Sequence, residues 1–324
     1  MNITAEPLQL PLEQTYDGIP FPFALHCTGG SDAGDSARWA TTQAEKLLSA
    51  ASLHGAVFLR GLPLETAEDL DIFVASFSLP NFPYSESLSN AHRINFTPRI
   101  FSANEAPGEL KIFLHHEMAQ TPTPPARLFF FCQEPATEGG ATPLCRSDVL
   151  WERILTGKPG FAADCKKKGL RYSNVMPAEA DEASTMGRSW QSTLNSTSKN
   201  EAEARLRELN YKWEWLSDGS LRATTPTLQA IRQTEDGRVV FFNQLIAAFH
   251  GWKDDRNEPG RAVTFGDGTP IDPGDVLWAA EAADSITFDL PWQAGDVAIL
   301  DNYLTMHGRR TFRGTRRVLA SLTA

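Results

Sequence analysis

The segment Lys111–Met118 places the strongest constraint on the fold, because it runs from an apolar stretch directly into His115, His116 and Glu117. Successive side chains of a β-strand point to opposite faces. If this segment is extended, His115 and Glu117 lie on one face and His116 lies on the other. The pair on one face can give two ligands to a metal ion, and a third ligand must come from another part of the chain.

His307, within the segment Asp301–Arg309, is the best candidate for the third ligand. Two histidines and one carboxylate, with other coordination positions open, form the facial triad typical of non-haem Fe(II) oxygenases. The alternative is that the histidines are structural, and these residues alone leave it open. A zinc-protease motif is excluded, because Gln120 stands where H-E-x-x-H needs its second histidine, and the prolines that follow disfavour the required helix.

Composition limits the class of protein. The chain has 324 residues, of which 41% are hydrophobic, so it can bury a large core. A net charge of -10 argues against a general affinity for nucleic acid or anionic membranes. No apolar run approaches the roughly 18 residues that span a bilayer, and the N-terminus lacks signal-peptide features. The four cysteines show no C-x-x-C spacing, so we expect reduced thiols and a cytoplasmic protein.

Apolar patterns predict helices before and between strands. We expect residues 1–35 to be irregular, because prolines and a Gly-Gly turn signal interrupt them. Predicted helices cover 35–53 and 67–77, on either side of a buried strand at 56–60. Strands dominate 110–146 and 285–324. The pattern favours a single α+β domain over 1–324, with a closed or sandwiched β core, supporting helices and a covering insertion at roughly 156–284.

Five segments, in order, resemble the taurine dioxygenase-like (TauD/TfdA) family of Fe(II)/2-oxoglutarate-dependent oxygenases. The likeness is closest to its clavaminate-synthase-like and SyrP-like members and runs from about Gly55 to the C-terminus. The segments are Leu114–Met118, Leu128–Cys132, Gly139–Pro143, Phe241–Gln244, and Gly295–Asn302 continuing through His307 to Arg317. The last of them is the most specific. The resemblance implies that the β core is a double-stranded β-helix, of the jelly-roll or cupin-like kind.

The resemblance also implies roles for individual residues. The Fe(II) ligands and catalytic residues would be His115, Glu117 and His307. Thr142 and Arg317 would bind the distal carboxylate of 2-oxoglutarate, for which arginine offers a planar two-pronged donor. We favour Arg317 over Arg316, because the family's arginine directly precedes an apolar pair of residues, and Arg316 would then point to the opposite face of the strand.

The relatives commonly oxidise amino acids or carrier-bound aminoacyl groups. The resemblance therefore implies hydroxylation of an unactivated C–H bond in such a substrate, within specialised metabolism. O2 and 2-oxoglutarate would be consumed, and succinate and CO2 released. Glu117 disfavours halogenation, which needs a small residue there. Ser321 stands where sulfonate-using members carry a second arginine, which disfavours taurine. Desaturation, cyclisation, a non-catalytic metal-binding β-barrel protein and a zinc hydrolase stay as alternatives.

The substrate pocket is the least constrained part of the prediction. Long connections often contact substrates, and this suggests Asn95 and Arg99 from the segment 80–110. Trp190 and Asn243 are further candidates. We expect a small-molecule partner, free or carrier-bound, without nucleic acid or membrane, and the sequence leaves a homo-oligomer open.

Overall fold

Two β-sheets form the centre of the molecule. The computed structural model describes residues 2–89, 91, 93–181, 184, 187–251 and 259–324. The larger sheet has seven strands, in the spatial order β1 (Thr4–Pro7), β4 (Phe23–Thr28), β5 (Ala56–Arg60), β18 (Val297–Asp301), β8 (Arg127–Glu134), β21 (Arg317–Thr323) and β6 (Phe101–Ser102). Strands β4 and β5 run parallel, whereas β18, β8 and β21 pair antiparallel.

The smaller sheet has four strands, in the order β17 (Thr287–Leu290), β10 (Thr142–Arg146), β19 (Thr305–Arg309) and β7 (Ile112–His115). The two sheets share one apolar cluster, to which the larger sheet gives Phe130 and Ala298 and the smaller sheet gives Leu144 and Phe288. Alternate residues of the larger sheet, such as Phe129, belong to a second cluster on its outer face. The core is therefore a two-sheet sandwich with an apolar layer on each side of the larger sheet.

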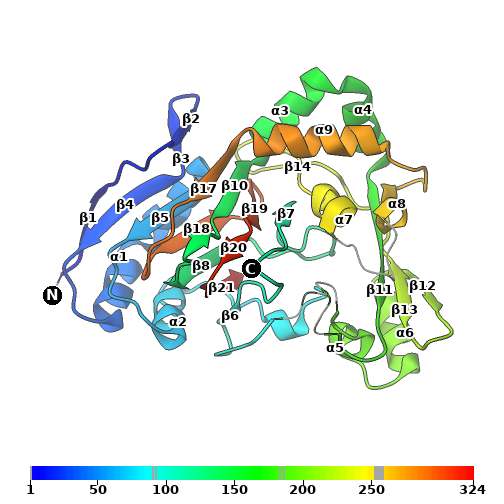
Figure 1. The fold of residues 1–324 in the computed structure, drawn as a ribbon, viewed down its shortest axis with the longest axis horizontal. Coiled ribbons are helices and arrows are strands. Elements are labelled where there is room, and N and C mark those ends of the chain that lie inside the picture. The colour runs from blue at the N-terminus through cyan, green and yellow to red at the C-terminus, as the bar shows by residue number, and fades with distance from the viewer. Residues whose placement is uncertain (1, 90, 92, 182–183, 185–186, 252–258) are drawn as a thin grey trace.

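Two helices cover the outer face of the larger sheet, α1 (Ala33–His54) and α2 (Ala67–Ala75) (Figure 1). Asp32 caps α1 by accepting a hydrogen bond from the backbone N–H of Asp35 at 2.9 Å. Gly55 ends the helix with φ at +95°, and a Cβ there would lie 2.5 Å from the Thr305 hydroxyl oxygen. The helix can therefore end this close to the sheet because the residue is glycine. The predicted order of helix, strand and helix at 35–77 is confirmed.

The segment between β10 and β17 adds helices and a third sheet beside the sandwich (Figure 1). Its helices are α3 (Ser147–Gly157), α4 (Pro159–Lys168), α5 (Trp190–Leu194), α6 (Lys199–Glu208), α7 (Leu245–Gly251), α8 (Pro259–Ala262) and α9 (Pro273–Asp284). Its sheet has the order β12 (Lys212–Trp215), β13 (Leu221–Thr224), β11 (Leu170–Met176) and β16 (Val263–Phe265). A short helix, η1 (Tyr84–Glu86), lies in the connection between α2 and β6.

The prediction that residues 1–35 are irregular is wrong. They contain β1 and β4, which extend the larger sheet. Strand β4 pairs with β5, about 30 residues further along the chain. Local composition gives no sign of such a pairing, because strand formation depends on the neighbouring strand and on burial. The remaining strands form two-stranded ribbons, namely β2 (Gln14–Tyr16) with β3 (Ile19–Phe21), β9 (Glu138–Gly139) with β20 (Phe312–Arg313), and β14 (Arg232–Gln233) with β15 (Val239–Val240).

Among the described helices, none combines the length and the apolar composition that a membrane-spanning helix requires.

Candidate active site

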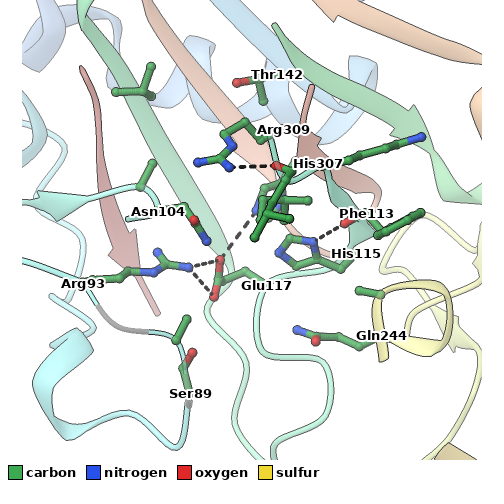
Figure 2. A pocket seen from close by; sticks show the side chains of 18 of the residues that line it. Ser89, Arg93, Asn104, Phe113, His115, Glu117, Thr142, Gln244, His307 and Arg309 are labelled. Carbon is green, nitrogen blue, oxygen red and sulfur yellow. Dashed lines mark hydrogen bonds and ion pairs between the residues drawn. The ribbon is translucent and has the colours of Figure 1, made fainter. Parts of the chain in front are cut away.

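The three predicted metal ligands lie together at one end of the smaller sheet (Figure 2). His115, the last residue of β7, pairs with His307 on β19, and their ring centroids are 4.4 Å apart. Glu117 follows β7, and its Oε2 lies 3.6 Å from Nε2 of His307. One ligand atom from each residue lies within 4.8 Å of those of the other two. This spacing allows the three side chains to share one metal ion.

The protonation states of this cluster suit a divalent metal. Nδ1 of His115 lies 2.7 Å from the carbonyl oxygen of Phe113, so when it donates there Nε2 keeps a free lone pair. Burial, together with His307, lowers the pKa of His115 to about 4. Burial alone would raise the pKa of Glu117, but Arg93 and His307 outweigh it and hold that pKa well below its usual range. A neutral imidazole and an ionised carboxylate are the forms that bind Fe(II), so the donor set fits this metal.

Glu117 reaches the cluster through a clamped turn. Strand β7 ends at His115, so the strand alternation expected through Glu117 does not extend that far. Asn302 holds the turn instead. Its Oδ1 accepts from the backbone N–H of Glu117 at 2.8 Å, and its Nδ2 donates to the Glu117 carbonyl at 2.9 Å. His116 packs against Phe242, with ring centroids 4.7 Å apart, and is not among the residues that line the cavity beside the ligands.

The ligands open into a cavity of about 380 Å³. The polar and charged residues that line it, besides the three ligands, include Ser89, Arg93, Asn104, Gln120, Thr142, Gln244, Arg309 and Arg316. Arg309 fastens the segment at the edge of this cavity, because its guanidinium donates to the carbonyl oxygens of Ala106, Pro107 and Leu110 at 2.7, 2.6 and 2.8 Å. The cavity is large enough for a small organic ligand next to the metal cluster.

Arg316 and Thr142 lie together in the wall of this cavity, with donors that an anion could use. Arg316 donates from Nε to the Gly140 carbonyl at 2.7 Å and from Nη2 to the Thr142 hydroxyl at 3.2 Å. Trp292 donates from Nε1 to the same hydroxyl at 2.9 Å. A hydroxyl accepts two hydrogen bonds and donates one. Since both acceptor positions are taken, the Thr142 hydrogen is left to donate to a ligand.

The positive charge of the Arg316 guanidinium also favours the binding of an anion. Burial and the nearby Arg309 lower the pKa of Arg316 to about 10, so the guanidinium is still charged at neutral pH. In the described part of the chain no carboxylate forms an ion pair with it. A buried charge without a counterion is destabilising, so a bound carboxylate would stabilise this part of the cavity.

The prediction that Arg317 faces the cavity is wrong. Arg317 is exposed, and Arg316 lines the cavity together with Val318. Leu319, two residues after Arg317, belongs to the cluster on the outer face of the larger sheet. Strand alternation therefore holds, but the inner row begins at Arg316.

None of the four residues predicted for the substrate pocket lines the described cavity, so this prediction is wrong. Asn95 is exposed, and Arg99 pairs with Asp71 at 2.9 Å. Trp190 is buried against Trp215, with ring centroids 5.1 Å apart. The Asn243 amide donates to the Ala230 carbonyl at 2.9 Å, within the core. These residues lie in connections and in the covering segment, whose position relative to the sheets is set by tertiary packing that local sequence does not report.

Sequence reasoning also missed Arg93, Asn302, Trp292 and Arg309. Asn302 and Arg309 lie within the segment most specific for the family, and that was the available signal. Trp292 follows β17 and is brought to Thr142 by the pairing of β17 with β10. Arg93 lies in the connection between η1 and β6, where no periodic pattern marks its orientation.

Known structures share this fold. PvcB of Pseudomonas aeruginosa superposes with a TM-score of 0.55 at 15% identity, covering 100% of this chain and 94% of that one. A second structure of PvcB is described as an Fe, alpha-ketoglutarate dependent oxygenase from an isonitrile synthetic pathway. An asparagine oxygenase in complex with Fe(II), 2S,3S-3-hydroxyasparagine and succinate superposes with a TM-score of 0.54 at 12% identity, covering 90% and 82% of the two chains.

The amino-acid sequence gives a closer relationship. A clavaminate synthase-like protein of Arabidopsis thaliana is 37% identical over 321 residues, which is 97% of this chain and 96% of the plant protein. The family described as "Taurine catabolism dioxygenase TauD, TfdA family" matches residues 20–323. With the fold and the ligand cluster, this defines an oxidoreductase of the dioxygenase class that uses Fe(II), 2-oxoglutarate and O2. The chain belongs to the TauD/TfdA family, as its sequence motifs indicated.

Proposed function

We propose that the protein hydroxylates an unactivated C–H bond of an amino-acid-like small molecule. The observation that carries this proposal is a single cavity that contains both the His115, Glu117 and His307 cluster and the anion site of Arg316 and Thr142. Fe(II) with 2-oxoglutarate and O2 supplies the oxidising chemistry when bound. The amino-acid assignment is supported by the asparagine oxygenase that shares the fold.

The residues have distinct tasks in this proposal. His115, Glu117 and His307 would hold Fe(II), which would supply this oxidising chemistry together with 2-oxoglutarate and O2. Arg316 binds the distal carboxylate of 2-oxoglutarate through its planar guanidinium, and Thr142 donates its hydroxyl hydrogen to the same carboxylate. Trp292 orients that hydroxyl. The cavity walls exclude water around the C–H bond.

Taurine is not the substrate that this cavity fits. Once Arg316 is the cosubstrate arginine, the position at which sulfonate-using relatives carry a second arginine shifts by one residue, from Ser321 to Ala320. Ala320 belongs to the apolar cluster between the sheets and offers no charge to a sulfonate. The family name therefore describes ancestry and cofactor use rather than the substrate of this protein.

Anaerobic absorption spectroscopy tests the cofactor assignment. Apo-protein is titrated with Fe(II), then with 2-oxoglutarate, and a weak visible charge-transfer band is expected only when both are present. Tight Zn(II) binding without such a band would favour a hydrolase or a non-catalytic metal-binding protein instead. Succinate release during a screen of amino acids, free and carrier-bound, then identifies the substrate, and the mass of the product separates hydroxylation from desaturation or cyclisation.

We also propose an assignment of the β core and of the domain limits. We take the two central sheets as the double-stranded β-helix, or jelly roll, of the family, and the whole of 1–324 as one oxygenase domain in which roughly 156–284 forms a covering insertion. We further propose a cytoplasmic enzyme of specialised metabolism that acts on a free or carrier-bound substrate. Gel filtration coupled to light scattering would establish whether it assembles as a homo-oligomer.

A further inference from the structure

Arg93 is a buried cation with unused hydrogen-bonding capacity. Its side chain is 6% exposed, and its Nη2 donates to both carboxylate oxygens of Glu117, at 3.2 and 3.0 Å. The guanidinium carbon lies 4.5 Å from the ring centroid of Tyr84. Nε is buried and has no hydrogen-bond partner among the described residues. A guanidinium carries five N–H donors, so Arg93 can bind another acceptor in addition to Glu117.

The other described cations of the cavity are already engaged. Arg309 donates to three backbone carbonyls. Arg316 reaches Gly140 and Thr142 in the cosubstrate site. The Lys111 ammonium lies 3.7 Å from Asp284. Figure 2 shows Arg93 next to Glu117, whereas Thr142 lies beyond His307 and Arg309. Arg93 thus provides a second positive charge, next to Glu117 and apart from the site of Arg316 and Thr142.

Within the described residues, Arg93 forms an ion pair with Glu117, which is also a proposed metal ligand. A bound divalent cation shares the single negative charge of this carboxylate and weakens its attraction to the guanidinium. A desolvated guanidinium then gains from a second anion. A carboxylate suits it best in a small-molecule cavity, because its two oxygens match the spacing of the guanidinium donors.

We propose that Arg93 binds the carboxylate of the prime substrate, which makes that substrate a small carboxylic acid held next to the metal ligands. This inference rests on the proposed function and specifies its substrate class. The carbon atoms closest to the metal would then be those within a few bonds of the carboxylate. Gln120 also lines the cavity, and its Oε1 is buried without a hydrogen-bond partner in the described chain. It can accept a hydrogen bond from an α-ammonium group, so an α-amino acid satisfies both residues.

The test uses Arg93→Gln and Arg93→Lys, with Arg99→Gln as the matched control. Arg99 lies on the same connection, but it pairs with Asp71 and does not line the cavity. The first measurement is the anaerobic band at saturating Fe(II) and 2-oxoglutarate, which all three variants are expected to reach, with more Fe(II) needed for the two Arg93 variants because Arg93 donates to Glu117. Its absence from the wild-type protein would refute the proposed function itself. Its presence in the wild type and loss in Arg93→Gln would overturn only the present inference, because Arg93 would then merely hold Glu117.

The second measurement is the shift of that band when each of the common L-amino acids, or its carboxamide, is added. We expect at least one acid to shift the wild-type band and its carboxamide to have no effect. In Arg93→Gln, the affinity for the amino acid that shifts the wild-type band should fall by about 30-fold or more, because a desolvated charge pair is lost. Arg99→Gln should behave as the wild type. If Arg93→Gln does not fold, Arg93→Lys replaces it, with roughly a tenfold loss expected because lysine lacks the planar fork.

Three results would overturn the assignment. These are a carboxamide that shifts the band as strongly as its acid, an Arg93→Gln protein that binds the acid with wild-type affinity, or a wild-type band that no acid shifts.

Discussion

The two ends of the cavity are built from different kinds of structure. At one end, Thr142 lies on β10, His307 on β19 and Arg316 directly before β21, so strand pairing fixes their positions, with register shifts next to His307 and Arg316. At the other end, Arg93 lies in the long connection between α2 and β6. It is held by Tyr84 and Glu117 rather than by a sheet.

This difference assigns separate tasks to the two ends. Strand register is set by the whole sandwich, so the sheet-built end changes little without loss of the fold. A surface connection tolerates substitution and carries variable function on a rigid scaffold. We therefore expect the cosubstrate end to follow the family and the Arg93 end to be particular to this protein. The following predictions test how independent the two ends are.

Loss of His307, the proposed metal ligand on β19, should have the largest effect, which is on metal affinity. His307→Ala removes one of three ligands, and the remaining pair is too few to retain Fe(II). We expect metal binding, measured by calorimetry with Mn(II) as a stable substitute, to disappear while the far-ultraviolet circular dichroism stays unchanged. His26→Ala, at an exposed position on β4, is the control. Wild-type metal affinity in His307→Ala would remove this residue from the ligand set.

Neighbouring arginines at the sheet-built end should differ sharply. Arg316→Ala should weaken 2-oxoglutarate binding by about 2–5 kcal/mol, the range for breaking a desolvated charge pair. Arg317→Ala should leave it unchanged, because Arg317 is exposed. Titration of 2-oxoglutarate into the Fe(II)-loaded protein without O2 measures both. The reverse result would mean that the inner row of β21 begins one residue later than the structure places it.

Asn302→Ala tests the clamp that connects the sheet to the Glu117 turn. Metal affinity should fall by about 10- to 100-fold, as is usual when a residue that orients a metal ligand is lost. The expected loss exceeds that of Asn200→Ala, which lies exposed on α6. Mn(II) calorimetry again provides the measurement. Equal affinity in both variants would show that the turn holds Glu117 without Asn302.

His116→Asn should have the smallest effect at neutral pH, and a visible one in acid. Burial lowers the pKa of His116 to about 3. In the unfolded chain, the pKa of a histidine is close to the model-peptide value of about 6.5. Between these values the unfolded chain binds more protons, so the free energy of unfolding rises with pH and falls on acidification. Removal of His116 should reduce this slope by up to about 1.4 kcal/mol per pH unit.

Urea unfolding of the metal-free protein at several pH values from 7 downward measures this slope, with His26→Asn as the exposed control. Metal binding should persist in His116→Asn, since His116 packs away from the cavity against Phe242. An unchanged slope would mean that the folded protein already accommodates a proton on His116.

Sequence reasoning was most effective where a strand carries chemistry. The alternation of β7 and the specific segment around His307 pointed to three side chains that the fold brings within 4.8 Å of one another. Strand alternation failed for Arg316 only in its starting point, because every residue of β21 beyond Arg317 is buried, so burial does not distinguish the row that faces the cavity from the row that faces away.

Elsewhere the sequence carried little information. Arg93 and Arg99 are six residues apart on one connection, yet one lies in the cavity and the other pairs with Asp71 outside it. The surroundings of each arginine depend on the path of the connection through the folded molecule, which local sequence does not specify. Strand β4 was missed for the same reason, since it is stabilised by β5 rather than by its own composition.

The clamp by Asn302 has a mechanical consequence. Asn302 lies in the turn between β18, a strand of the larger sheet, and β19, the strand of the smaller sheet that carries His307. Asn302 holds the Glu117 turn, and His307 pairs with His115. The short segment from Asn302 to His307 therefore links all three proposed ligands by direct contacts. The connection that carries Arg93 is joined to the same turn by the ion pair between Arg93 and Glu117, so a displacement of that connection would act directly on one of the three proposed ligands.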